Sequence, residues 1–387
     1  MQYPTISEYV KASQDASDNL DMPTEATNAE LNEAITDEWG VKYSKDGRKL
    51  LKAPQELNGT YPIRKGLYGT YSIKEGTKII CDMASDSCRS LSSLVIPESV
   101  TSIGDCAFRG CRSVYSIVIP DSVTSIGNEA FDGCSFLHSV VISDCVTNIG
   151  DYAFRGCTSM SSLIIPDSVT SIGDSAFRGC YSLTNIVIPN SVTSIGARAF
   201  EGCESLTNIA IPDGVTSIGV YAFWGCNSLT NIAIPDGITS IEERTFLDCC
   251  SLIDIVIPDS VVSIGDDAFM NCCSLSSLVI PDSVTSIGRG AFWGCSSLNS
   301  LVIPDSVTRI GDSAFRGCSS LSNVVIPNGV TRIGDSAFRG CKSLTDIVIP
   351  DSVTSIGDSA FRHCNFPNDI EQELISRFGE EIFEETF

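Results

Sequence analysis

Residues 183–189 read Leu-Thr-Asn-Ile-Val-Ile-Pro, and close copies of this stretch recur every 23 residues. Its Ile-Pro step lies on an unbroken grid from Pro97 to Pro350, with Ser143 in the single position that lacks proline. Thirteen cysteines, from Cys88 to Cys364, follow the same period. A unit this short cannot bury its own apolar face, so neighbouring units must stack, and a constant period predicts a solenoid.

The stretch itself has the alternation of a β-strand. By the period of two, Ile186 and Ile188 should point inward, while Asn185, Val187 and Pro189 should point outward. Proline has no N–H to donate, so we expect Pro189 to end the ladder of hydrogen bonds.

The rest of the unit predicts a second extended piece and a turn. Residues 191–196 place Val192 and Ile195 inward, and Ala199-Phe200 together with the two residues that follow should form a tight, helical turn leading to Cys203.

Two columns of the repeat indicate special backbone. The residue before each ladder cysteine is Gly in nine units and Asp248, Asn271 or His363 in the others, so we predict a left-handed conformation there in every coil. An Asp follows the Ile-Gly step in seven units, Asp174 among them, and should cap the N–H groups of its turn.

Residues 168–180, Ser-Val-Thr-Ser-Ile-Gly-Asp-Ser-Ala-Phe-Arg-Gly-Cys, resemble the repeat of the bacterial BspA-like leucine-rich-repeat family. The resemblance implies a curved right-handed solenoid used for protein binding or adhesion, without a cofactor or catalytic residues. We therefore expect a leucine-rich-repeat solenoid of parallel β-strands, with short or helical turns in each coil and small helical caps. Ser191 and its equivalents stand where the general leucine-rich repeat carries an asparagine ladder.

We divide the chain into a helical segment of unknown role (1–40), an N-terminal cap with a decayed repeat (41–88), twelve repeats (89–364) and a C-terminal capping helix with an acidic tail (365–387). Further expectations concern the ends. They are capping boxes at 5–8 and 27–30, a hairpin at 41–51, strands at 60–63 and 70–73, and an amphipathic helix at 368–385 that begins with a capping signal at 368–371.

The cysteine count of 18 raises two questions of chemistry. We interpret the thirteen ladder thiols as small buried hydrophobes, which implies a reducing compartment. The successive pairs Cys249-Cys250 and Cys272-Cys273 could bring four sulfurs together as a zinc site, but adjacent residues in extended chain point in opposite directions, so packing is the favoured role.

The chain carries 48 acidic and 25 basic side chains, a net charge of −23. Such a polyanion is a poor ligand for nucleic acid or anionic lipid, and no apolar run is long enough to span a membrane. Carboxylates that follow the proline, or Ser143 in its place, in ten units could suggest calcium, but we expect turn acceptors whose mutual repulsion is relieved by salt. The opening residues 1–8 lack signal-peptide character, which predicts a cytoplasmic location, whereas the resemblance allows the cell surface.

We expect no enzymatic activity, cofactor or metal. The two histidines, His138 and His363, are 225 residues apart and cannot share a site in a stack of coils, and no phosphate loop or nucleophile motif occurs.

We expect the chain to be a monomer that binds a protein partner. Two outward surfaces are candidates for this binding. One is an apolar stripe on the strand face, which includes Val187, Ala210, Ala233, Val256 and Val279. The other is a strip at the position after the ladder Phe, where four consecutive coils replace the usual Arg by Trp224, Leu247, Met270 and Trp293. For each, the alternative is structural: strand propensity for the stripe, and a drifting, partly buried column for the strip. The sequence thus predicts a non-catalytic protein-interaction scaffold, with a surface adhesin for host matrix protein or carbohydrate as the alternative.

Overall fold

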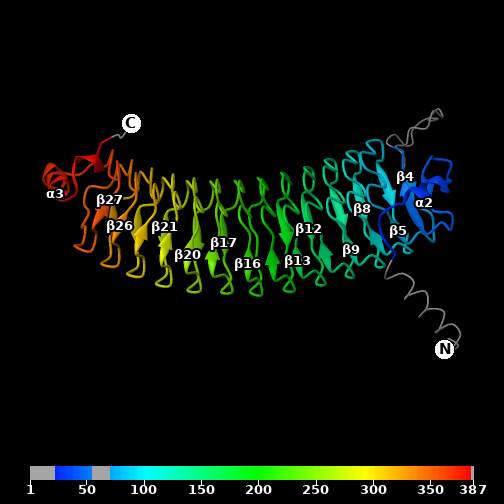
Figure 1. Cartoon of the computed structure of the whole chain (residues 1–387), viewed down its shortest axis with the longest axis horizontal. Coiled ribbons are helices and arrows are strands. Elements are labelled where there is room, and N and C mark those ends of the chain that lie inside the picture. The colour runs from blue at the N-terminus through cyan, green and yellow to red at the C-terminus, as the bar shows by residue number, and fades with distance from the viewer. Residues whose placement is uncertain (1–21, 55–69, 385–387) are drawn as a thin grey trace. The chain divides into compact units, whose positions relative to one another are not determined.

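The structure is a computed structural model that describes residues 22–54 and 70–384, and the chain forms a β-solenoid of about 12 parallel coils. Its residues group into two compact units, Met1–Thr158 and Ser159–Phe387. Figure 1 shows short strands on two sides of the coils in each unit. Two expected segments, the capping box at 5–8 and the strand at 60–63, lie outside the described residues.

In Met1–Thr158, the first strand row comprises β4 (Thr70–Ser72), β6 (Ser93–Val95), β8 (Ser116–Val118) and β10 (Ser139–Val141). An outward valine ends each of these strands except β4, which has Ser72 at that position. The second extended pieces form a second strand row: β5 (Ile79–Ile80), β7 (Ser102–Ile103), β9 (Ser125–Ile126) and β11 (Asn148–Ile149). Pairing is parallel and in register with the repeat, as in Ile117 opposite Val140.

In Ser159–Phe387, the first strand row comprises β12 (Ser162–Ile164), β14 (Asn185–Val187), β17 (Asn231–Ala233), β19 (Asp254–Val256), β21 (Ser277–Val279), β23 (Ser300–Val302) and β25 (Asn323–Val325). The second strand row comprises β13 (Ser171–Ile172), β15 (Ser194–Ile195), β16 (Ser217–Ile218), β18 (Ser240–Ile241), β20 (Ser263–Ile264), β22 (Ser286–Ile287), β24 (Arg309–Ile310), β26 (Arg332–Ile333) and β27 (Ser355–Ile356).

The core lies between the two strand rows and is made by the predicted inward columns. Ile186 and Ile188 are buried while Val187 is half-exposed, and Val192 and Ile195 are buried as expected. The ladder phenylalanines stack coil on coil, with ring centroids 5.2 Å apart for Phe246 and Phe269. Burial of one such ring stabilises a fold by about 1.5–3 kcal/mol, so the repeated Phe column is a large part of the core.

One outward assignment in the strand stretch is wrong. Pro189 is buried, although the period of two places it outside. The first strand row ends at Val187, two residues earlier, so the alternation no longer applies at the proline.

The turn between the second strand row and the ladder cysteine is not helical. In the coil of Phe200, the amides of Arg198, Phe200 and Gly202 donate to the next coil, and those of Glu201 and Cys203 donate back within the turn. This alternation uses two left-handed residues, Arg198 (φ 58°) and Gly202 (φ 71°). Hydrogen bonds to the neighbouring coil thereby replace those of a helix.

The predicted left-handed column before the ladder cysteine is confirmed. Its nine glycines have positive φ, as do Asp248, Asn271 and His363. A second left-handed column, two residues before the ladder Phe, was not predicted. It holds Cys106, Glu129, Tyr152, Ser175, Arg198, Tyr221, Arg244, Asp267, Gly290, Ser313, Ser336 and Ser359.

Short polar side chains join successive coils. The hydroxyl of Ser191 donates to the carbonyl of Val169 at 2.6 Å, which gives serine the position of the missing asparagine ladder. Asp174 accepts the amide of Ala197 at 2.7 Å. The aspartates after the Ile-Gly step therefore cap the next coil rather than their own turn, contrary to expectation.

The first helix in the described residues is α2 (Asn28–Asn32), whose capping box between Thr27 and Glu30 is formed as predicted. Strands β1 (Ile35–Thr36), β2 (Lys42–Tyr43) and β3 (Lys49–Lys52) follow, and β2 and β3 form the expected antiparallel hairpin. Because β3 pairs in parallel with β5, the hairpin covers the first edge of the second strand row.

The C-terminal helix is shorter than expected. Helix α3 (Asn368–Phe378) ends where Gly379 adopts φ 94°, and the 3-10 helix η1 (Glu380–Ile382) follows. No side chain caps its start, because Pro367 occupies the N-cap position and Asn368 is already helical. Leu374 and Ile382 are buried, and the amide of Phe361 donates to the carbonyl of Ile382 at 2.9 Å.

Candidate interaction surfaces

The first strand row of Ser159–Phe387 presents a continuous column of outward apolar side chains, which we call the valine row. Exposure is 50% at Val187 and 77% at Val279. The five predicted stripe residues all face outward in this row, and Ala210 lies in it without belonging to a regular strand. The valine row comprises Ile164, Val187, Ala210, Ala233, Val256, Val279, Val302, Val325 and Val348.

On one side of the valine row, beyond the outward Asn185 position, lies a column made mostly of hydroxyl side chains, with Ile253 and Asn299 in two of its coils. Thr184 donates to the carbonyl of Ser161 at 3.0 Å, and Ser322 donates to that of Asn299 at 3.2 Å. These bonds fix the hydroxyls in one orientation and leave their oxygen atoms available as acceptors.

The other edge carries carboxylates. Beyond the Ile-Pro step, most coils of this unit present an exposed aspartate, which we call the acidic row. The only ion pair found for it in the described residues joins Asp351 to Arg377 at 3.9 Å. The acidic row comprises Asp167, Asp213, Asp236, Asp259, Asp282, Asp305 and Asp351.

Met1–Thr158 carries an aromatic group that the sequence analysis missed. Tyr115 stacks on His138 with ring centroids 4.4 Å apart, and Tyr115 and Phe136 are each more than half exposed. Phe136 lies in a column that otherwise holds Ser, and Tyr115 and His138 lie in one that holds mostly Ser or Thr, so this change of residue type was the available signal. Val118 and Val141 are exposed in the same coils.

The predicted aromatic strip is less open than the valine row. Leu247 is buried, and Trp224, Met270 and Trp293 are half-buried. The indole of Trp224 donates to Asp248 at 3.1 Å, and the guanidinium of Arg316 lies 4.6 Å above the ring of Trp293. Part of the strip's surface is therefore used by contacts within the solenoid.

Twelve of the thirteen ladder cysteines are buried, as predicted, and the last one, Cys364, is half-buried. The thiol of Cys203 donates to the carbonyl of Phe177 at 3.3 Å, and burial raises its pKa well above the ordinary range. Cys249 and Cys272 belong to this ladder, whereas Cys250 and Cys273 are exposed. The four sulfurs therefore do not converge, and no group of three or more metal-binding side chains occurs in the described residues.

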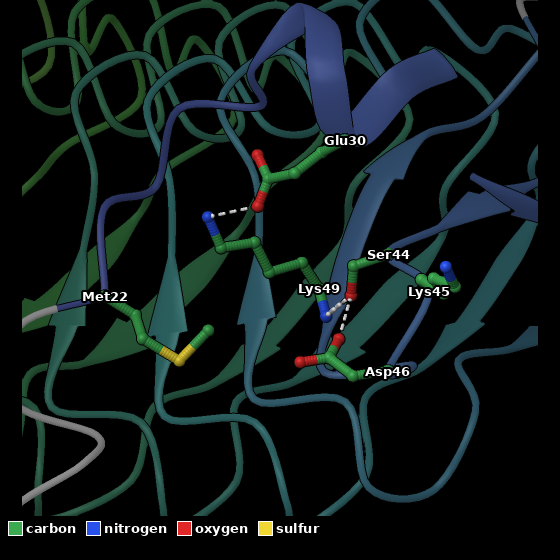
Figure 2. Close-up of a pocket in the computed structure, with 6 residues that line it drawn as sticks. All are labelled: Met22, Glu30, Ser44, Lys45, Asp46 and Lys49. Carbon is green, nitrogen blue, oxygen red and sulfur yellow. Dashed lines mark hydrogen bonds and ion pairs between the residues drawn. The ribbon is translucent and has the colours of Figure 1, made fainter. Parts of the chain in front are cut away.

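A pocket of about 370 Å³ lies beside the N-terminal hairpin (Figure 2). The amine of Lys49, whose side chain is only 6% exposed, pairs with Glu30 at 2.9 Å. Figure 2 shows that Glu30 comes from α2 and Lys49 from the hairpin, with Ser44 and Asp46 across the pocket. The pair holds α2 against the hairpin, because Lys49 would otherwise be a buried charge without a counterion.

No helix within residues 22–54 or 70–384 is long and apolar enough to span a bilayer.

Coils that bury columns of Leu, Ile, Phe and Cys between two parallel strand rows define a leucine-rich-repeat protein. The repeat described as BspA type Leucine rich repeat region (6 copies) matches residues 78–206, 170–299 and 262–386. The chain therefore belongs to the BspA-type leucine-rich-repeat family, as the sequence resemblance indicated.

Solved structures of bacterial proteins are similar to this chain. A leucine-rich repeat protein from Bacteroides ovatus is 30% identical with a TM-score of 0.67, covering 87% of this chain and 88% of its own. A leucine rich cell surface protein from Faecalibacterium prausnitzii is 32% identical with a TM-score of 0.52, covering 84% and 95%. A leucine-rich repeat protein from Eubacterium ventriosum is 27% identical with a TM-score of 0.52, covering 72% and 84%. No curated protein matches the chain significantly.

Proposed function

We propose that the chain is a non-catalytic scaffold that binds a protein partner through the valine row. The observation that carries this proposal is the exposure of an apolar side chain in successive coils, including 66% at Val256 and 77% at Val279. A continuous apolar column of this kind is larger than the scattered apolar residues that monomers usually expose. Burial of each exposed valine contributes about 1 kcal/mol to binding, so several coils acting together can hold a partner.

The edges of the valine row define the chemistry of the partner. The acidic row attracts Lys or Arg side chains, and the net charge of −23 increases the rate of encounter with a basic protein. The hydroxyl edge offers fixed acceptors for N–H donors. A partner with apolar side chains flanked by basic ones fits all three columns.

A matched pair of variants tests the proposal. Val256 and Val262 are exposed valines of the same coil, at 66% and 48%, but only Val256 lies in the valine row. A partner captured on the immobilised full chain is identified, purified and titrated against V256D and V262D. We expect V256D to weaken binding at least tenfold and V262D to change it less than about twofold, because an aspartate in the contact must be desolvated. Equal affinities of V256D and wild type would contradict the proposal.

The strip of Trp224, Leu247, Met270 and Trp293 is the second proposed binding face. Tryptophan and methionine are frequent anchors of interfaces, which supports it. If the strip binds the partner, W224R and W293R weaken binding while V256D does not. Circular dichroism of both variants controls for loss of fold, since each indole also contacts its neighbours.

An adhesin for host matrix protein or carbohydrate is the alternative function. It is favoured by the cell surface protein of Faecalibacterium prausnitzii, which is 32% identical to this chain. Fractionation of the source cells, together with binding of the full chain to immobilised matrix proteins and glycans, distinguishes the two. A cytoplasmic chain without affinity for either ligand class supports the scaffold, and a surface-exposed chain that binds one of them supports the adhesin.

A further inference from the structure

Two exposed thiols occupy the same position of two successive coils. All 18 cysteines lie in the described residues, and only Cys145, Cys250 and Cys273 are exposed. The neighbours of the last two, Cys249 and Cys272, point into the core and donate to backbone carbonyls. Cys250 and Cys273 thus stand apart from the ladder.

The spacing of the coils brings the two exposed thiols together. The amide of Ser274, next to Cys273, donates to the carbonyl of Cys250 at 3.2 Å. The Phe246 and Phe269 rings, four residues before each cysteine, are 5.2 Å apart. Disulfides form between residues whose Cα atoms are about 4.4–6.8 Å apart, a range that includes one coil spacing. Burial, followed by the influence of the neighbouring Cys273 thiol, raises the pKa of Cys250 above its ordinary value.

We propose that Cys250 and Cys273 form a dithiol site that a small-molecule disulfide oxidises to a disulfide joining the two coils. One thiol, as its thiolate, attacks a sulfur of the small disulfide, giving a mixed disulfide and releasing one small thiol. The second protein thiolate then attacks the protein sulfur of the mixed disulfide and releases the other small thiol. Two protein S–H groups become one S–S bond, and one small disulfide is reduced to two thiols.

The remaining cysteines are not expected to form a disulfide with the reagent in this way. The ladder thiols are buried apart from the half-buried Cys364, and burial raises the pKa of Cys272, Cys295 and Cys364 far above the ordinary value. Cys145 is exposed, but the residues 23 positions before and after it are Ser122 and Ser168, so its mixed disulfide has no second thiol in the repeat position. It serves as an internal control for reagent access.

The test uses the reduced full chain, oxidised glutathione as the probe, and mass spectrometry after the free thiols are blocked. We expect wild type to lose two hydrogen atoms and to gain a single glutathione, on Cys145. Because Asp254, Asp259 and Asp266 lie between the two cysteines, cleavage at aspartate separates Cys250 from Cys273 unless a disulfide joins them.

C250S and C273S are the matched variants, and serine occupies this column in the next coils at Ser296 and Ser319, so the fold should tolerate it. Neither variant can form the disulfide, so neither should show the loss of two hydrogen atoms. Each should instead gain a second glutathione, on its remaining thiol at position 250 or 273, in addition to the one on Cys145. Wild type that carries glutathione on both Cys250 and Cys273, or a disulfide that maps to a vicinal pair such as Cys249-Cys250, overturns the proposal. So does wild type in which both thiols stay free while Cys145 is modified.

Discussion

Gly311 and Gly317 belong to one coil but are required for different physical reasons. Gly317 has φ 73°, and the nearest atom of a neighbouring coil would be 3.8 Å from an added Cβ. At Gly311, an added Cβ would lie 2.5 Å from the carbonyl oxygen of Gly288 in the preceding coil. The first glycine therefore serves backbone conformation, and the second allows close approach of two coils.

We expect G317A to lower the free energy of unfolding by about 1 kcal/mol, the cost of a left-handed alanine. G311A should lower it by about 3 kcal/mol, because the coils must move apart to admit the methyl group. Urea denaturation followed by circular dichroism measures both. An equal cost for the two variants would show that close approach at Gly311 is not the constraint.

The residue types predicted the left-handed column before the ladder cysteine but not the left-handed column two residues before the ladder Phe. Glycine, Asp248, Asn271 and His363 tolerate positive φ and marked the column before the ladder cysteine. The column of Arg198 and Tyr221 holds side chains that usually avoid this conformation, so composition gave no signal there. Hydrogen bonds to the next coil impose it, and such bonds are visible only once the coils are stacked.

Among the elements, helix α2 depends for its stability on one ionised side chain, that of Glu30. Glu30 accepts the Thr27 amide at 2.8 Å and pairs with Lys49 at 2.9 Å. The hydrogen bond from the Thr27 amide, followed by that from Lys49, lowers the pKa of Glu30 below its ordinary value of 4.5. A lowered pKa in the folded state means that the stabilisation is present above about pH 4.5 and is lost as the pH falls through the folded value.

E30Q should therefore loosen α2 at neutral pH, by about 1–2 kcal/mol, since Lys49 loses its counterion. Hydrogen exchange at the amides of Leu31 and Lys49, compared between E30Q and wild type at each pH, measures the effect. The difference should be large at pH 7 and shrink below pH 4.5. A difference that persists undiminished at pH 3 would mean that the charge of Glu30 is not responsible.

The ends show where local signals succeed and where they fail. The capping box at Thr27 and the hairpin were predictable because each is fixed by a few adjacent residues. The predicted length of helix α3 was too great because Ile382 continues the four-residue spacing of the helix's apolar face, although Gly379 ends the helix. Ile382 is nevertheless buried, so the spacing identified a core residue in the wrong element.

At the scale of the whole chain, the repeat places many side chains of the same negative charge close together. The acidic row stacks carboxylates at coil spacing, and the net charge is −23. Sodium chloride should raise the unfolding temperature by a few degrees, because it screens repulsion that exists mainly in the folded state. Calcium chloride at equal ionic strength is the matched control. A further rise in calcium would indicate specific ion binding, and no response to either salt would contradict the repulsion.

The period of 23 predicted the solenoid and its core, because a fixed repeat allows few ways of burying one apolar face. It predicted the outward valine row for the same reason. The period could not show which of the two surfaces, the valine row or the strip of Trp224 and Trp293, is the more exposed binding face. The partial burial of the strip depends on contacts with Asp248 and Arg316 from neighbouring positions. Partner identity depends on surface columns that a repeat leaves free to vary.

The central claim, that the valine row contacts the partner, is tested most directly by carbene footprinting of the full chain with and without its captured partner. We predict loss of labelling on β17, β19, β21 and β23, centred on Val256, Val279 and Val302, with the second strand row unchanged. Loss of labelling confined to the turns around Trp224 and Trp293, or to the two ends, would contradict the claim.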